Sequence, residues 1–552
     1  MSMHAPLFYL IPEQTARVAQ AAFPKGNSYM RMRDAFGPIY TNPEFAALFS
    51  KTGQPAEAPA QLALITVMQF AEGLSDEQAA DAVRGRIDWK YALALELTDA
   101  GFDSSVLSEF RKRLLTGNAE LLLFETMLTL FREQGLIKAK GRQRTDSTHV
   151  LAAIQTLNRL ECVGETLRHA LNSLAAAAPD WLRAWVPAVW FDRYSRPFAE
   201  YRLPAEKPAR YALAEQIGTD GLQLLRMLYD PTAPTSLQEL PTAQVLRQVW
   251  VQQFYAASDD QAVRWRTAED LPGAARLIQS PYDPDARYSR KRDTEWTGYK
   301  VHLTETCDDD TPNLITDVTT TPAPSADSEV LPIIQAQLAN RQLRPGEQIV
   351  DAGYVSADHL ITSERDHRIE LLGPVGDDHS WQAHADTGFA AAQFVIDWDA
   401  KQALCPQGQR SVVWKEQPDR HGHATVQIAF SKPGCAGCPC RADCTRAAAG
   451  PRILRIRERD HYQALQAARE RQQSVEFKAE YARRAGIEGT ISQGVHTGDL
   501  RRSRYIGEAK TRLMHLLLAA ALNFMRVAAW LAETPRSRTR QCAFAALAGA
   551  PS

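Results

Sequence analysis

Hydrophobic residues recur at helical spacing near the start of the chain. An apolar stripe runs through Leu62–Met68 and predicts a helix. Ser75, followed three residues later by Gln78, forms a capping box that predicts a second helix. A third helix is predicted from Ser105. The pattern therefore predicts an all-helical N-terminal domain over residues 1–135.

Beyond this region, runs with β propensity alternate with helical ones. Asp146 lies inside a polar run that is typical of a strand, although strand interiors are depleted in aspartate. Thr297–Thr306 alternates apolar and polar side chains, which predicts a half-buried strand that pairs with a strand over 314–320. A short buried strand ends at Asp351, where α/β sheets place their functional sites. These patterns predict an α/β domain.

The predicted α/β domain covers residues 136–534 and is interrupted twice. Residues 165–285 are rich in Ala, Leu and Trp at helical spacing, which predicts a helical insert with tryptophans used for packing. Residues 376–450 hold short β-like runs and most of the cysteines, which predicts a small cysteine-rich β insert. Residues 452–484 are predicted as a long basic helical region. An amphipathic helix then reaches Leu531, and residues 535–552 are expected to form a flexible tail.

The overall charge excludes a uniformly positive DNA-binding surface. The formal net charge is −2, so any contact with nucleic acid depends on local basic patches. The N-terminal domain has tight turns similar to a helix-turn-helix module, and its last predicted helix ends in a basic run. The candidate DNA-binding residues are Arg111, Lys112, Arg113, Arg142, Arg144, Arg290, Lys291, Arg292, Arg501, Arg502 and Arg504.

The cysteines cluster more than chance allows. Four of the eight lie between Cys435 and Cys444. Cys435 and Cys438 have the spacing that chelates a tetrahedral ion from one turn, and Cys405 and Cys444 can complete a four-cysteine zinc site. Cys440 could replace Cys444. Free buried thiols are the alternative. So few cysteines predict no disulfide scaffold, and we expect a cytoplasmic protein without a membrane span.

A late stretch places three polar residues together. Tyr481, Arg484 and Glu488 fall on one face of a predicted helix. Alone, they could form an ordinary surface ion pair. Asp146 and Asp351 are the other two acids in unusual contexts, and if all three converged, their carboxylates would repel one another unless divalent cations neutralised them. The carboxylates would then hold two Mg²⁺ or Mn²⁺ ions, and Arg484 and Tyr481 could contact phosphate.

The motifs around these acids resemble the DDE transposases of bacterial insertion sequences. The matching segments are Thr145-Asp146-Ser147-Thr148, Trp296-Thr297-Gly298-Tyr299-Lys300-Val301-His302, Ile349-Val350-Asp351-Ala352-Gly353-Tyr354, Tyr481-x2-Arg484-x3-Glu488 and Gly489-Thr490-Ile491-Ser492-Gln493. The third acid motif is similar to the Tyr-Arg-Glu signature branch, within which some members carry a four-cysteine insert. One position differs, since Val495 stands where that branch usually has a lysine that touches DNA; His496 or a later arginine could serve instead.

The resemblance implies an RNase H-like mixed sheet with flanking helices, with Asp146, Asp351 and Glu488 as the catalytic acids. It also implies binding of double-stranded DNA at terminal inverted repeats and at a target, strand cleavage and transfer, and a homodimer on paired ends in the nucleoid. Whether excision passes through a hairpin stays open. Trp381, Trp398 and Trp414 could stack a flipped base or simply pack. Two other functions remain: a DNA-binding protein without activity, and a nuclease that does not join strands.

Overall fold

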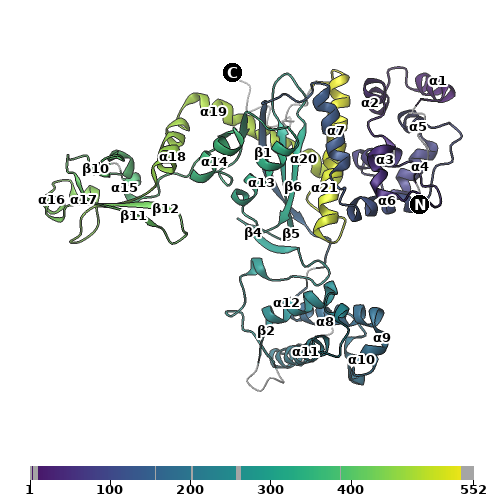
Figure 1. The fold of residues 1–552 in the computed structure, drawn as a ribbon, viewed down its shortest axis with the longest axis horizontal. Helices are drawn as coiled ribbons and strands as arrows, with labels where there is room; N and C mark the ends of the chain where they lie inside the picture. Colours follow the sequence, from purple (N-terminus) through teal and green to yellow (C-terminus); the bar gives the residue numbers. More distant parts are fainter. Residues whose placement is uncertain are drawn as a thin grey trace, which may run out of the picture.

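A central sheet organises the molecule, with helices beside it and two lobes projecting from it (Figure 1). The computed structural model describes residues 3, 10–155, 157–199, 203–256, 263–385 and 387–535. The expected flexible tail, residues 535–552, lies outside this part except for its first residue. The strands of the central sheet are β1 (Arg142–Leu151), β4 (Arg287–Lys291), β5 (Thr294–Thr306), β6 (Ile315–Pro322), β7 (Glu347–Ile349) and β8 (Glu370–Leu372).

The sheet is mixed. β5 lies between β1 and β6 and is antiparallel to both, whereas β7 is parallel to β1 and β8 is parallel to β7. β4 pairs with the start of β5, so that Leu151 and Arg287 are both level with Gly298. The predicted α/β class is confirmed. β5 is buried on both faces over most of its length, rather than half-buried, because helices cover both sides of the sheet.

Helices α13 (Asp327–Asn340) and α21 (Glu508–Leu531) cover opposite faces. Arg341, just after α13, pairs with Asp317 of β6, while His515 of α21 bonds to Thr320. Side chains three apart on a strand point to opposite faces, which separates the two helices. α21 is long and apolar enough to cross a bilayer, but 78% of its most apolar window is buried inside the protein, as in a core helix.

The N-terminal part is helical, as predicted. Its helices are α1 (Glu13–Ala22), α2 (Ser28–Phe36), α3 (Pro59–Glu72), α4 (Asp76–Gly85), α5 (Ile87–Leu93), α6 (Ser105–Thr116) and α7 (Leu122–Glu133). The capping box forms as expected: Gln78 N–H donates to the Ser75 hydroxyl, and Ser75 N–H donates to the Gln78 side chain. α3 packs along α21, and these helices share one hydrophobic core with the sheet.

The helical insert has a core of its own and hangs below the sheet in Figure 1. It comprises α8 (Arg159–Ala177), α9 (Pro179–Arg183), α10 (Ala188–Tyr194), α11 (Lys207–Leu228), α12 (Pro241–Gln253) and a hairpin of β2 (Phe254–Ala256) and β3 (Val263–Trp265). α8 begins at Arg159, before the predicted start of the insert at residue 165, because Asn158 caps the helix there. Trp190 and Trp250 are buried in this core, and Trp181, Trp185 and Trp265 pack against it, so the predicted packing role is confirmed.

The cysteine-containing lobe lies at the left of Figure 1. Its elements are β9 (Val395–Asp397), β10 (Gln402–Leu404), β11 (Ser411–Pro418), β12 (Ala424–Phe430), the short helices α16 (Lys432–Ala436) and α17 (Arg441–Cys444), and β13 (Ile453–Arg457). The prediction that residues 452–484 are all helical was wrong at its start. Leu454 and Ile456 are buried at alternate positions, and β13 pairs with β12. Helix α18 (Arg459–Arg471) begins only after this strand.

Candidate active site

Two aspartates lie side by side at neighbouring strands. The parallel register pairs Arg144 of β1 with Ile349 of β7. Asp146 and Asp351 each follow two residues later, so the register brings them level. Asp146 is 8% exposed, whereas Asp351 is partly exposed in the turn after β7. Gly353 N–H donates to Asp351 Oδ1 at 2.8 Å and fixes the carboxylate in that turn.

One guanidinium connects both aspartates to the third acid. Arg484 Nη2 lies 2.7 Å from Asp146 Oδ2 and 3.9 Å from Asp351 Oδ2, and its Nη1 lies 3.6 Å from Glu488 Oε1. The three predicted acids are more than 100 residues apart in sequence, and all three therefore meet at the guanidinium of Arg484. Glu488 is the most accessible, with 68% of its side chain exposed.

The electrostatics of the site favour a bound cation. Burial raises the pKa of Asp146 and the charge of Asp351 adds to this, although Arg484 and the Ser147 N–H oppose it. Clustered carboxylate oxygens are hard ligands of the kind that Mg²⁺ and Mn²⁺ prefer. As placed, however, the described residues include no group of three or more His, Cys, Asp or Glu side chains arranged to hold a metal ion. The three carboxylates are the type of ligand that a divalent ion takes. In this structure the Arg484 guanidinium lies between them instead.

The helix that carries these residues differs from the prediction of one continuous α-helix. Tyr481 lies near the end of α19 (Val475–Ala482), Arg484 lies in a 3₁₀ turn (Arg483–Ala485), and Glu488 lies in the first turn of α20 (Gly486–Gly498). A 3₁₀ turn winds more tightly than an α-helix, so it changes the direction in which Arg484 points. The Tyr481 ring stacks on Phe477, with ring centres 5.6 Å apart.

Buried polar residues support the turn that carries Asp351. Lys300 Nζ donates to Asp327 Oδ1 at 2.9 Å, and the Ser147 hydroxyl donates to the same oxygen at 3.2 Å. The buried side chains of Tyr354 and His302 share a hydrogen bond of 2.6 Å. Burial lowers the pKa of His302 to about 4, so its ring is neutral near pH 7.

Some of these residues had no predicted role. Lys300 and His302 were part of the Trp296–His302 motif without a function, and Asp327 was not singled out. Glu305 was also missed, although the strand pattern contains a signal for it. Tyr299, Val301 and Leu303 occupy the apolar face of β5, and the next residue on that face is the charged Glu305. A charged residue that continues an apolar face has a buried partner or a function.

Two of the candidate DNA-binding arginines are turned inward. Arg111 is 8% exposed and pairs with Asp76 at 2.6 Å, and Arg144 is 7% exposed and pairs with Glu305 at 2.6 Å. Neither can reach a phosphate as placed, because each guanidinium is held by a carboxylate inside the protein. Arg113 is partly buried against the Phe49 ring, and Arg142 lies near the carboxylates of Asp308 and Asp309.

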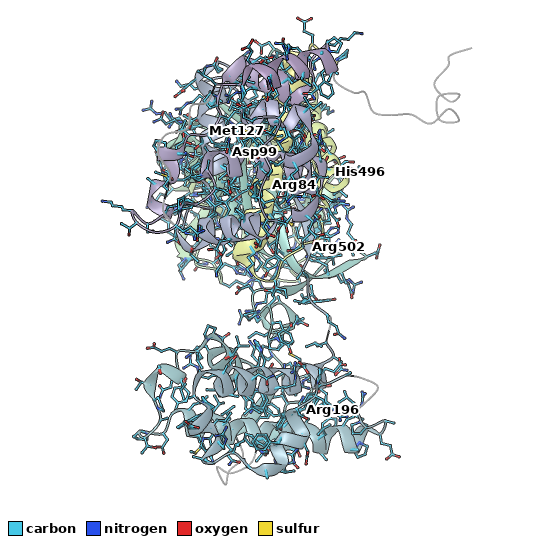
Figure 2. The ribbon with its side chains drawn as sticks, turned by 90° about the vertical axis from the view of Figure 1, so that its right-hand side faces the viewer. Arg84, Asp99, Met127, Arg196, His496 and Arg502 are labelled. Carbon is cyan, nitrogen blue, oxygen red and sulfur yellow. The ribbon has the colours of Figure 1, made fainter. Side chains whose placement is uncertain are left out.

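The remaining basic candidates are exposed. They are Lys112, Arg290, Lys291, Arg292, Arg501, Arg502 and Arg504. Arg290 pairs with Glu295 at 3.5 Å, and Arg501 Nε donates to the Thr148 hydroxyl, two residues beyond Asp146, at 2.9 Å. Arg502 forms a β-bridge with Leu151, and Figure 2 shows it low on the main body, above the lobe that holds Arg196.

Four cysteines gather in the β lobe. Cys405, Cys435, Cys438 and Cys444 line one cavity of about 30 Å³, whereas Cys440 does not line it. Burial raises the pKa of the Cys444 thiol, and the other three sulfurs add to this effect, while Arg452 opposes it. Four thiolates are the ligand set that a structural zinc ion takes, although the described cysteines, as placed, are not arranged to hold an ion.

Two family models match the chain. Residues 17–113 match a transposase domain family (DUF772), and residues 404–528 match a transposase DDE domain family, which includes Tyr481, Arg484 and Glu488. No curated protein and no solved structure gives a significant match. The two matched segments lie on either side of the strands that carry Asp146 and Asp351, and the structure joins both to one core. Both matches are to transposase domain families, and together they support a DDE transposase of an insertion sequence.

Proposed function

We propose that this transposase binds the terminal inverted repeats of its element and catalyses divalent-metal-dependent DNA cleavage and strand transfer. The contact of Arg484 with Asp146, Asp351 and Glu488 is the observation that carries this proposal. Two aspartates on neighbouring parallel strands and a glutamate on a helix beside the sheet are also the arrangement that an RNase H-like transposase domain requires.

The residues divide the chemistry as follows. Asp146, Asp351 and Glu488 would hold the metal ions, which would activate a water or a 3′-hydroxyl and stabilise the leaving oxygen. Arg484 is suited to bind the phosphate under attack, because its planar guanidinium can donate two parallel hydrogen bonds. Tyr481, whose ring stacks on Phe477, would donate a hydrogen bond to the DNA beside Arg484.

The exposed basic residues are the proposed DNA contacts. Arg501 and Arg502 are close to β1, which makes them suited to hold DNA near the site. Lys291 ends β4 and Arg292 follows it, and Lys112 is exposed on α6 of the N-terminal helices. We propose that a homodimer on paired element ends performs the reaction, in the cytoplasm at the nucleoid.

The experiment that tests this function uses the full-length protein with DNA carrying the terminal inverted repeat, a target plasmid and Mg²⁺. Strand-transfer products that depend on Mg²⁺ and disappear with EDTA are the expected result. Cleaved ends without joined products would identify a nuclease instead. Binding of the repeat with neither reaction would identify a DNA-binding protein without activity.

We further propose that the four clustered cysteines hold a structural zinc ion. Purified protein is expected to contain about one zinc ion per chain by elemental analysis, because a structural zinc site takes four such ligands. Cys435→Ser should lose this zinc, since it removes a ligand from the cavity. Cys440→Ser is the matched control and should keep the zinc, because Cys440 does not line the cavity. Equal zinc content in both variants would contradict the site.

A further inference from the structure

Glu305 is a charged residue with no access to solvent. Its side chain is 0% exposed, and it lies on β5, on the face toward α20 and α21. One of its oxygens accepts from Arg144 Nε at 2.7 Å and lies 2.6 Å from Arg144 Nη2. The other accepts from Arg526 Nη1 at 2.8 Å and from the Thr490 hydroxyl at 2.5 Å. A single carboxylate thus joins β1, β5, α20 and α21.

The contacts of Arg144 extend to the 3₁₀ turn. Arg144 Nη1 donates to the backbone carbonyl of Arg483 at 2.5 Å. The guanidinium also lies against Gly486, where an added Cβ would stand 2.0 Å from Nη1 and 2.3 Å from Cζ. Arg484 and Ala485 lie between these two residues in the chain. Glu305 therefore fixes Arg144, and Arg144 fixes the turn from which Arg484 reaches the two aspartates and Glu488.

We propose that Glu305 is a positioning residue, which acts through Arg144 and Thr490 to hold the 3₁₀ turn and the start of α20 against β1. The inference rests on the proposed function, because it assigns Glu305 to the same site. Glu305 does not itself face substrate. Its charge matters because Arg144 and Arg526 are buried guanidiniums that need a carboxylate between them. The turn needs rigid support because a displacement of about 1 Å at a reacting group can cost about 100-fold in rate.

A pair of glycine variants tests this positioning. Gly486→Ala puts a methyl group into the Arg144 guanidinium, whereas Gly489→Ala, on the same helix, meets no atom within 4 Å. Both changes replace a glycine of α20 with alanine, which favours the helix, but only the change at Gly486 meets Arg144. Gly486→Ala should lower the rate of strand cleavage at saturating DNA about 100-fold, with the half-saturating DNA concentration unchanged. Gly489→Ala should match the wild type.

A measurement without DNA separates positioning from general damage. Mn²⁺ binding, followed by electron paramagnetic resonance, should weaken about tenfold in Gly486→Ala and in Glu305→Gln, because the carboxylates no longer converge. Thermal melting of each variant checks that it is folded. If either variant does not fold, Thr490→Val, which removes one hydrogen bond to Glu305, should show the same weakening to a smaller degree.

The outcomes decide as follows. Wild-type rates and Mn²⁺ affinity in Gly486→Ala would overturn the inference, and so would equal losses in Gly486→Ala and Gly489→Ala. A loss of DNA affinity alone would also overturn it, because it would place Glu305 in DNA binding. A wild-type protein with no cleavage or strand transfer would refute the proposed function instead, while the Mn²⁺ measurement would still report on the positioning.

Discussion

Asp351→Asn is expected to abolish strand cleavage, with a loss of about 10³-fold or more in rate. Asparagine keeps the shape of the side chain but removes the charge that a divalent ion requires. The same loss is expected for Asp146→Asn, because the parallel register of β1 and β7 makes the two carboxylates equivalent members of one site. The rate of cleavage of inverted-repeat DNA in Mg²⁺ measures the effect.

A matched control makes the same aspartate-to-asparagine change at a position outside the group of Asp146, Asp351 and Glu488. Asp309 pairs with Arg483, the residue before Arg484, and 74% of its side chain is exposed. Asp309→Asn should therefore leave the cleavage rate within about twofold of wild type, since exposed ion pairs contribute little. DNA binding should persist in all three variants. Cleavage by Asp351→Asn at more than about a tenth of the wild-type rate would contradict the assignment.

Asp317→Ala should lower the free energy of unfolding by about 3–5 kcal/mol. Asp317 is fully buried on β6 and pairs with Arg341 at 2.5 Å, and the Arg341 side chain is only 8% exposed. Removing the carboxylate leaves a guanidinium inside the protein without its buried partner. Burial raises the pKa of Asp317 even though Arg341 opposes the shift, which indicates how strongly this position disfavours an isolated charge. Urea unfolding, followed by circular dichroism, measures the change.

Glu125 provides the control for this pair. It also binds Arg341, at 2.7 Å, but it lies on α7 and 40% of its side chain is exposed. Glu125→Ala should cost only about 0–1 kcal/mol, because water replaces the lost carboxylate. A similar cost for the two variants would mean that burial of Asp317 is not what makes it important.

Patterns that depend on neighbouring residues could be predicted from the sequence. The capping box at Ser75 and the strand that ends before Asp351 are set by residues within one or two turns, and both appear as expected. The three acids could be brought together only through the family resemblance. Their meeting depends on the register of β1 with β7 and on the docking of α20, which no local pattern contains.

The fate of individual basic residues could not be predicted. Arg144 and Arg111 stand in runs that look like solvent-exposed DNA contacts. Their partners, Glu305 and Asp76, are 161 and 35 residues away in sequence, so only the fold reveals the pairing. The strand Ile453–Arg457 was missed for a similar reason. Its partner β12 stabilises it as a third strand, while the basic residues around it favour a helix.

The pairing of Leu151 and Arg287 with the same residue, Gly298, means that the chain leaves and re-enters the sheet at almost one point. A polymer segment whose ends are held together by the rest of the fold can vary in length at little cost in closure entropy. The helical insert also has a hydrophobic core of its own, separate from the core around the sheet. Gly298 has φ near +153°, and a side chain there would stand 2.2 Å from the Val150 carbonyl oxygen. Gly298 thus marks the point of β5 beside which both ends of the insert meet the sheet, so the insert could change in length over evolution while the strands keep their pairing.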